Sequence, residues 1–169
     1  TNAIKNPLLS IITNISYEHA DILGPEIKDI AFEKAGIIKE NVPIITGAED
    51  NEALAVFKEI AKKRNSKLTI LHNTTSFQLT EKNLDHQTFN LNYNNKVYDN
   101  IKLNILGEHQ IKNSALAIRA LNLLPNKYRV SKENIYKGLA NCSWPGRLEI
   151  MKRKSNIILD GVHNVDGIN

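Results

Sequence analysis

Residues 8–47 decide the fold of this chain, and they read LLSIITNI (8–15), SYEHADILGP (16–25) and EIKDIAFEKAGIIKENVPIITG (26–47). The first block is a continuous apolar run bounded by turn residues, which is typical of a strand buried on both faces of a parallel sheet. A polar loop with Glu18 and His19 follows this strand. Because open α/β sheets bind ligands at the carboxyl ends of their strands, the loop is a candidate site.

A helix is predicted to start at Gly24 and Pro25, at the end of the second block, and to continue into the third, with Pro at the first helical position, where its missing N–H costs nothing. Gly36 is expected at the C′ position that ends the helix. The predicted apolar stripe consists of Ile27, Ile30, Ala31 and Ala35. Lys34 lies on the same stripe, seven residues after Ile27, so a lysine is expected to face inward close to the polar loop.

The next elements predict a parallel sheet. Residues 42–46 and 68–71 are short apolar runs, and an amphipathic helix is expected between them, ending at about Arg64 with Asp50 as its N-cap. Strands that alternate with helices in this way form βαβ units with right-handed crossovers. The fold class is therefore α/β with a parallel sheet.

The period of the apolar residues changes after the third strand. Alternation with polar residues is carried by Phe77, Leu79, Phe89, Leu91, Tyr93, Ile101, Leu103 and Ile105. This spacing indicates half-exposed antiparallel strands, with Asn94 and Asn95 as a tight turn between two of them. We predict an antiparallel extension that is covered on one face only.

The last third of the chain predicts helices at 108–124 and 133–140, the first largely buried and the second with Ser131 or Lys132 near its N-cap. Residues 141–145 break the pattern, and strands are expected at 148–151 and 157–159. We place a domain boundary near Ser143, so that 1–143 form one domain and 144–169 a linker with the start of a second α/β domain. The second part is shorter than the roughly 40 residues that fold unaided. Together with a start lacking Met, this suggests a piece of a longer protein.

Composition narrows the class of protein. Charged residues make up 24% of the chain, the formal net charge is +4, and the lysines are scattered rather than clustered. Such a surface favours anionic ligands over nucleic acid as partners. No apolar run approaches the length of a membrane span, so no membrane partner is expected. The single Cys142 suits a reducing cytoplasm.

Common catalytic motifs are absent from these residues: neither GxxxxGK[ST], GxGxxG, CxxC nor HExxH occurs, and no Ser-His-Asp pattern is present. A scattered polar set remains, namely His19, Lys34, His109, Asn113, Arg147, Asp160 and His163. Each also has an ordinary structural explanation. A lysine on an apolar stripe can extend its amine to water, a His–Asn pair one turn apart can cap a helix, and Arg147 can pair with Glu149. These residues alone predict an α/β ligand-binding protein.

A family resemblance goes further. ITNISYEHADILG (12–24), EKAGIIK (33–39), LGEHQIKNSALAIRAL (106–121), WPGRLEI (144–150) and ILDGVHNVDG (158–167) follow one another in this order. Together they resemble the folylpolyglutamate synthase / dihydrofolate synthase group of the Mur ligase family, ATP-dependent enzymes that form amide bonds. The resemblance implies that 1–143 are the second half of the central ATPase domain, after its phosphate loop and acidic magnesium ligand. Residues 144–169 would then open the C-terminal, glutamate-ligase domain.

The resemblance also implies metal ligands. His19 matches a histidine that binds a second Mg²⁺, and Lys34 matches a lysine that carbon dioxide converts to a carbamate. The chemistry agrees with the position of Lys34, because only a neutral amine adds carbon dioxide and burial favours the neutral form. A carbamate is an anionic oxygen ligand of the kind that Mg²⁺ prefers. The family usually has Asp where this chain has Glu18, which would alter groups around the metal.

Three positions match ATP contacts of the family: Asn113, Arg147 near the phosphates, and Asp160 near the ribose. His163 matches a residue that faces the substrate cleft, so Lys34, Arg147 and His163 are the implied catalytic residues. The family usually has Pro where this chain has Val165, a change in loop stiffness. Neither departure removes an implied ligand.

The implied reaction joins L-glutamate to a carboxylate of folate or dihydropteroate. ATP phosphorylates that carboxylate, and the glutamate amine then displaces phosphate. We expect a monomeric, cytoplasmic enzyme with ATP and Mg²⁺, inactive as these 169 residues alone. Three alternatives stay open: a muropeptide ligase of the same family, a non-catalytic nucleotide-binding or scaffold domain, and a nucleic-acid-binding fragment, which would need a basic face.

Overall fold

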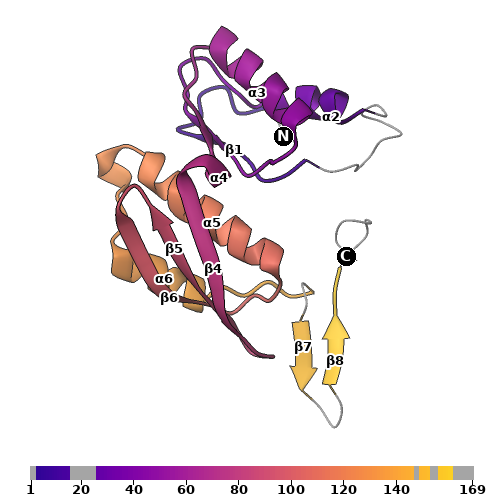
Figure 1. Ribbon diagram of the computed structural model, residues 1–169, viewed down its shortest axis with the longest axis vertical. Helices are drawn as coiled ribbons and strands as arrows, with labels where there is room; N and C mark the ends of the chain where they lie inside the picture. The colour runs from indigo at the N-terminus through magenta and orange to yellow at the C-terminus, as the bar shows by residue number, and fades with distance from the viewer. Residues whose placement is uncertain (1–2, 16–25, 147–148, 153–155, 162–169) are drawn as a thin grey trace. The chain divides into compact units, whose positions relative to one another are not determined.

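The computed structural model describes residues 3–15, 26–146, 149–152 and 156–161 (Figure 1). It confirms a mixed α/β fold, with a parallel three-stranded sheet, an antiparallel three-stranded sheet and an antiparallel two-stranded sheet among these residues. The chain divides into two compact units. One comprises residues up to 73 together with 116–129, and the other comprises 74–115 together with 130 onward.

The first unit is built on the parallel sheet that the sequence predicts. Its strands β1 (Ser10–Ile12), β2 (Ile44–Thr46) and β3 (Leu68–Ile70) lie in that order, and Ser10 pairs with Ile44, which pairs with Leu68. Helices α2 (Ile27–Ala35) and α3 (Asn51–Lys63) are the two crossover helices. Each strand has three residues, fewer than the predicted runs 8–15, 42–46 and 68–71.

The core of the first unit lies between α2, α3 and one face of this sheet. Phe57, Ile30, Ile38 and Ile44 are fully buried there, and Ile12 joins them from β1. Ile11 points to the opposite face and is 41% exposed. Within the described residues β1 is an edge strand, and the core cluster contains Ile12 but not Ile11. The expectation that the first strand is buried on both faces was therefore wrong for these residues.

The helix ends agree only in part with the prediction. Asp50 caps α3 as predicted, and its Oδ1 accepts hydrogen bonds from the backbone N–H groups of Glu52 and Ala53, both at 2.9 Å. Helix α2, however, begins at Ile27 after Glu26, not at Pro25, which lies outside the described residues. Gly36 adopts right-handed helical angles instead of a left-handed cap. The chain closes α2 with short-range bonds, such as Gly36 N–H to the Glu33 carbonyl at 3.1 Å.

The second unit contains the predicted antiparallel sheet. After the short helix α4 (Leu71–Thr74), strands β4 (Thr75–Lys82), β5 (Gln87–Tyr93) and β6 (Lys96–Leu103) form a meander in that order. Asn94 and Asn95 make the β5–β6 turn with φ of 45° and 60°, as the turn chemistry predicts. One face is covered: Phe89 and Leu91 on the central strand are fully buried. Phe77 on β4, by contrast, is 37% exposed.

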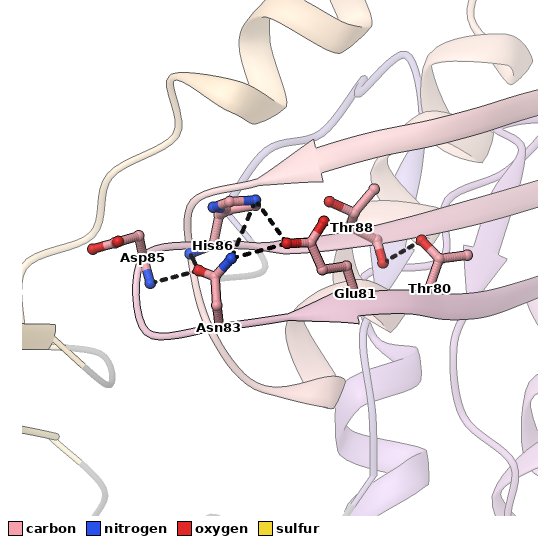
Figure 2. A network of polar contacts seen from close by, with 6 residues as sticks. All are labelled: Thr80, Glu81, Asn83, Asp85, His86 and Thr88. Carbon is pink, nitrogen blue, oxygen red and sulfur yellow. Dashed lines mark hydrogen bonds and ion pairs between the residues drawn. The ribbon is translucent and has the colours of Figure 1, made fainter.

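A side-chain network closes the β4–β5 hairpin, as Figure 2 shows. The Asn83 Oδ1 accepts hydrogen bonds from the backbone N–H groups of Asp85 and His86, at 2.9 and 3.0 Å. Its Nδ2 donates to the Glu81 carboxylate at 3.1 Å. Asparagine readily organises a turn in this way, because its side chain imitates a backbone turn. The network fixes the point at which β5 begins, directly after His86.

Helices follow the meander. α5 (Glu108–Leu123) is largely buried, as predicted, and the turn η1 (Asn126–Tyr128) leads to α6 (Lys132–Ala140) with Ser131 as the N-cap. α6 packs on β6, where the Tyr136 hydroxyl donates to the Asp99 carbonyl and Lys132 Nζ to the Val97 carbonyl, both at 2.8 Å.

The chain ends in strands β7 (Glu149–Lys152) and β8 (Asn156–Leu159), which pair antiparallel. Both strands were predicted. The segment before β7 carries the exposed Trp144, and the Gly161 N–H after β8 donates to the Gly146 carbonyl at 2.7 Å. Within the described part of the chain, no helix is long and apolar enough to cross a membrane.

Candidate functional site

The carboxyl edge of the parallel sheet is built around Gly47. Its N–H donates to the Ile12 carbonyl at 2.9 Å, which joins the ends of β1 and β2. A Cβ at this position would lie only 2.4 Å from the Thr13 carbonyl oxygen, so a larger residue would force the two strand ends apart. Thr46, fully buried, accepts a hydrogen bond from the Ala48 N–H at 3.0 Å. The edge at which a ligand is expected is therefore tightly packed.

Lys34 reaches this edge from α2. Its Nζ donates to the Asn14 carbonyl, just after β1, at 3.5 Å. The side chain is half-buried, whereas Ile30, Ala31 and Ala35 on the same stripe are fully buried. The predicted position near the end of the first strand is confirmed. The predicted inward orientation holds only for the stem, because the amine lies at the margin of the core.

The predicted partner of Lys34, His19, lies outside the described residues, so a metal site shared by the two stays a prediction. The Asn14 carbonyl beside the amine is an oxygen of the kind that a hard cation binds, and the predicted carbamate on Lys34 would add further oxygens. Among the described residues, no three His, Cys, Asp or Glu side chains come together in a group that could hold a metal ion.

Asn113 lies on an exposed position of α5, where a ligand can reach its carboxamide. Its Nδ2 donates to the Gln110 Oε1 at 3.3 Å. The neighbouring His109 ring packs over Gly107, where a Cβ would lie 2.7 Å from the His109 Cε1. The His109–Asn113 pair was also open to explanation as a capping network, but the recorded partner of the Asn113 side chain is Gln110.

Asp160 follows β8 and is exposed. The hydrogen bond from Gly161 to the Gly146 carbonyl ties this strand end to the segment before Arg147. Arg147 and His163 themselves lie outside the described residues. Of the predicted site residues that are described, Lys34 therefore belongs to the first compact unit, and Asn113 and Asp160 belong to the second.

The two longest of the buried polar side chains, Gln87 and Arg119, were not singled out by the sequence patterns. Gln87 is fully buried at the start of β5, and Arg119 is 5% exposed on α5. A signal was present in both cases. Gln87 precedes Phe89 and Leu91 at the same two-residue spacing, so it shares their inward face. Arg119 lies in a helix that is apolar on nearly all sides.

Comparison with known proteins gives a family. The Mur ligase middle domain matches residues 1–121. The dihydrofolate synthase/folylpolyglutamate synthase of Bacillus subtilis is 38% identical over 170 residues, which covers 99% of this chain and 39% of that protein. Among solved structures, the apo form of L. casei FPGS superposes with a TM-score of 0.91 at 30% identity, covering 99% of this chain and 41% of the other. An FPGS–AMPPCP–folate complex has the same TM-score, the same identity and the same coverage of both chains.

The match extends over nearly the whole chain, but the chain spans only about two fifths of the length of these relatives, 39% for the Bacillus subtilis protein and 40% for the folylpolyglutamate synthase of Lacticaseibacillus casei. The parallel sheet with its crossover helices and the antiparallel meander both lie within the matched residues 1–121. This chain belongs to the Mur ligase family, and its residues 1–121 correspond to the middle domain of that family.

Proposed function

We propose that this chain is part of an ATP-dependent ligase that adds L-glutamate to a carboxylate of folate or dihydropteroate. The observation that carries the proposal is the similarity, over 99% of this chain, to a structure titled as an FPGS–AMPPCP–folate complex. AMPPCP is an ATP analogue, so that relative holds a nucleotide and a folate together. A relative at 25% identity, E. coli FolC, is titled as a complex with DHPP and ADP.

The proposed reaction has two steps. The carboxylate of the pteroate or folate substrate attacks the γ-phosphorus of ATP, giving an acyl phosphate and ADP. The amino group of L-glutamate then attacks the acyl carbon, an amide forms, and inorganic phosphate leaves. Protein groups contribute chiefly by positioning the reactants and stabilising charge on the transferred phosphoryl group.

Lys34 is proposed to become a carbamate that, with His19, holds a Mg²⁺ ion. The half-buried Lys34 side chain supports this role, because its amine lies beside the Asn14 carbonyl, just after β1 and before the predicted loop. Mg²⁺, when bound, would supply charge stabilisation for phosphoryl transfer. The contribution of Lys34 is to extend an anionic oxygen ligand from a rigid helix.

Asn113, Arg147 and Asp160 are proposed ATP contacts, and His163 is proposed to face the acyl substrate. The exposure of Asn113 and Asp160 supports their availability to a nucleotide. The family resemblance assigns Arg147 to the phosphates and Asp160 to the ribose.

We also propose that residues 144–169 are a linker and the start of the C-terminal domain, with the boundary near Ser143. The exposure of apolar side chains on β8 supports this: Ile157, Ile158 and Leu159 are 46%, 59% and 43% exposed. Further chain of such a domain would cover them. The proposed compartment is the cytoplasm, and the proposed state is a monomer.

The test uses the complete protein encoded with this chain. Release of ADP and phosphate is measured with ATP, Mg²⁺ and L-glutamate, and with dihydropteroate, a reduced folate or a UDP-muropeptide as acceptor. Turnover with either pteridine acceptor, and formation of its glutamylated product, supports the proposal. Turnover with the muropeptide alone would assign the protein to the muropeptide branch instead. ATP binding without turnover on any acceptor would favour a non-catalytic domain. The 169-residue chain alone, which lacks a GxxxxGK[ST] motif, is the control and is expected to be inactive.

A further inference from the structure

Gln87 is an unusual residue for the inner face of the antiparallel sheet. It is fully buried, and its Nε2 donates to two backbone carbonyls, Ile105 at 2.7 Å and Gly107 at 2.9 Å. Two carbonyl acceptors identify this end of the carboxamide as the NH₂ group, because only that group donates. Within the described residues, the buried Oε1 finds no hydrogen-bond partner.

An unsatisfied buried acceptor costs free energy, whereas an apolar side chain of similar size would fill the same space without that cost. Stability of the sheet is therefore a weak reason for a glutamine here. The two donated hydrogen bonds are what a glutamine provides and a methionine does not, and both hold residues 105–107.

Residues 105–107 lead directly into α5. Gly107 has a φ of +105°, a backbone conformation that L side chains rarely adopt, so it can make this turn where other residues would be strained. The Gly107 carbonyl accepts from Gln87 and also from the backbone N–H of Gln110, at 3.0 Å, in the first turn of α5. Gln87 thus holds the carbonyl on which this helix begins.

The same connection continues to Asn113. The Gln110 Oε1 accepts a hydrogen bond from the Asn113 Nδ2 at 3.3 Å. A series of hydrogen bonds therefore runs from Gln87 through Gly107 and Gln110 to a proposed ATP contact. The tip of the β4–β5 hairpin supports its first member, because the Asn83 turn in Figure 2 ends at His86, next to Gln87.

We infer that Gln87 is a positioning residue for the nucleotide: it fixes the first turn of α5 and, through Gln110, the orientation of the Asn113 carboxamide. The inference rests on the proposed function in that Asn113 must contact ATP. Gln87 itself is buried and does not touch the ligand. Its loss should weaken ATP binding and leave the other substrates unaffected.

The test is steady-state kinetics of the complete protein with Gln87→Met, which keeps the length of the side chain and removes both donors. Gln78→Met, at an exposed position of β4 in the same sheet, is the matched control. For Gln87→Met we expect the KM for ATP to rise by about 3- to 10-fold, the loss typical of one or two hydrogen bonds. The KM for L-glutamate and kcat should stay within about twofold of wild type.

A purely structural role gives a different result. Fewer folded molecules would lower kcat and leave every KM unchanged, and that outcome would overturn the inference. An unchanged KM for ATP in a fully active Gln87→Met protein would overturn it as well. Wild-type protein without pteridine-dependent turnover would instead overturn the proposed function, so the two failures are distinguishable.

Two further measurements keep the inference testable if Gln87→Met folds poorly. Gln110→Leu replaces a half-buried side chain of α5 by one of similar size and removes the acceptor for Asn113, so it should also raise the KM for ATP. No change there would contradict the last link. Hydrogen exchange of the Gln110 amide, which needs no activity, should be faster in Gln87→Met than in Gln78→Met, and equal exchange would contradict the first link.

Discussion

The two three-stranded sheets of this chain are specified in different ways. The parallel sheet has strands of three residues each, and its register depends on crossover helices that bring together segments more than 20 residues apart. The antiparallel sheet has strands of seven and eight residues joined by tight turns, and its register is set by Asn83, Asn94 and Asn95 close by in sequence. The register of the parallel sheet therefore depends on packing between segments distant in sequence, and that of the antiparallel sheet depends on local turn residues.

This difference separates two tasks. The short parallel strands end at one edge, where Gly47 allows close approach and Lys34 presents its amine. Lys34, the proposed metal ligand, lies there. The antiparallel sheet presents no proposed reactive group, but it holds the start of α5 through Gln87. The following predictions probe the division, beginning with the largest effect.

Lys34→Ala in the complete protein tests the parallel-sheet edge. Loss of a carbamate ligand should lower kcat by a factor on the order of 10² or more, as for a lost group that stabilises transition-state charge. Formate or acetate should partly restore turnover by replacing the missing carboxylate-like oxygens. The control is Lys28→Ala on the same helix, where the lysine is exposed and pairs with Glu26. Near-normal turnover of Lys34→Ala would identify an ordinary surface-reaching lysine.

Gly47→Ala should destabilise the parallel sheet by about 1–3 kcal/mol, since the added Cβ lies 2.4 Å from the Thr13 carbonyl oxygen and the strand ends must move. Gly138→Ala in α6 is the matched control, because nothing lies within 4 Å of its added Cβ. Because alanine favours the helix more than glycine does, Gly138→Ala should raise the free energy of unfolding by about 0.5–1 kcal/mol. Urea denaturation measures both. Equal effects of the two substitutions would mean that the close approach at Gly47 is relaxed without cost.

Asn95→Ala should cost about 1 kcal/mol, because alanine is strained at a φ of 60°. Asn95→Gly should be neutral or stabilising, since glycine favours this turn. Both variants remove the Asn95 side chain, but only glycine adopts the positive φ easily. The difference between their free energies of unfolding, measured by urea denaturation, therefore reports the cost of the backbone conformation alone. A glycine variant as unstable as the alanine variant would show that local turn chemistry does not set the β5–β6 register.

Tyr136→Phe should have the smallest effect, a loss of about 0.5–1 kcal/mol in the free energy of unfolding, from the lost hydrogen bond to the Asp99 carbonyl. Burial, together with the nearby Asp99 carboxylate, raises the pKa of Tyr136 above its ordinary value of 10.0. The folded state therefore favours the neutral phenol. Its contribution is fully present below pH 10 and falls as the pH rises through the higher pKa of the folded protein. The variant should lose this part of the alkaline dependence, and an unchanged profile would contradict the assignment.

Much of the architecture follows from local sequence patterns. Asp50 before an amphipathic run predicts a capped helix, and the alternation of Phe89, Leu91 and Tyr93 with an Asn-Asn turn predicts a hairpin. Both are confirmed. The place of Lys34 on the same helical stripe as Ile30 and Ala31 also follows from helical spacing. These features depend on residues within one or two turns of one another.

What the patterns did not predict depends on distant segments. The exposure of Ile11 reflects which elements cover β1, and an apolar run alone does not carry that information. The need for glycine at position 47 arises from its register beside Thr13, more than 30 residues away. Gln87 shows the same limit, because its two acceptors lie at 105 and 107.

Trp144 gives the chain an optical property. It is the only tryptophan of the sequence, and its indole is 64% exposed just before Gly146. Light absorbed selectively by indole therefore reports on this one segment, and an exposed indole emits at long wavelength. Any ligand or chain segment that covers it will shift the emission to shorter wavelength and reduce quenching by iodide. The chain thus carries a built-in fluorescent label close to the end of β8, where Asp160 lies. The hydrogen bond from the Gly161 N–H to the Gly146 carbonyl joins this strand end to the segment that carries Trp144.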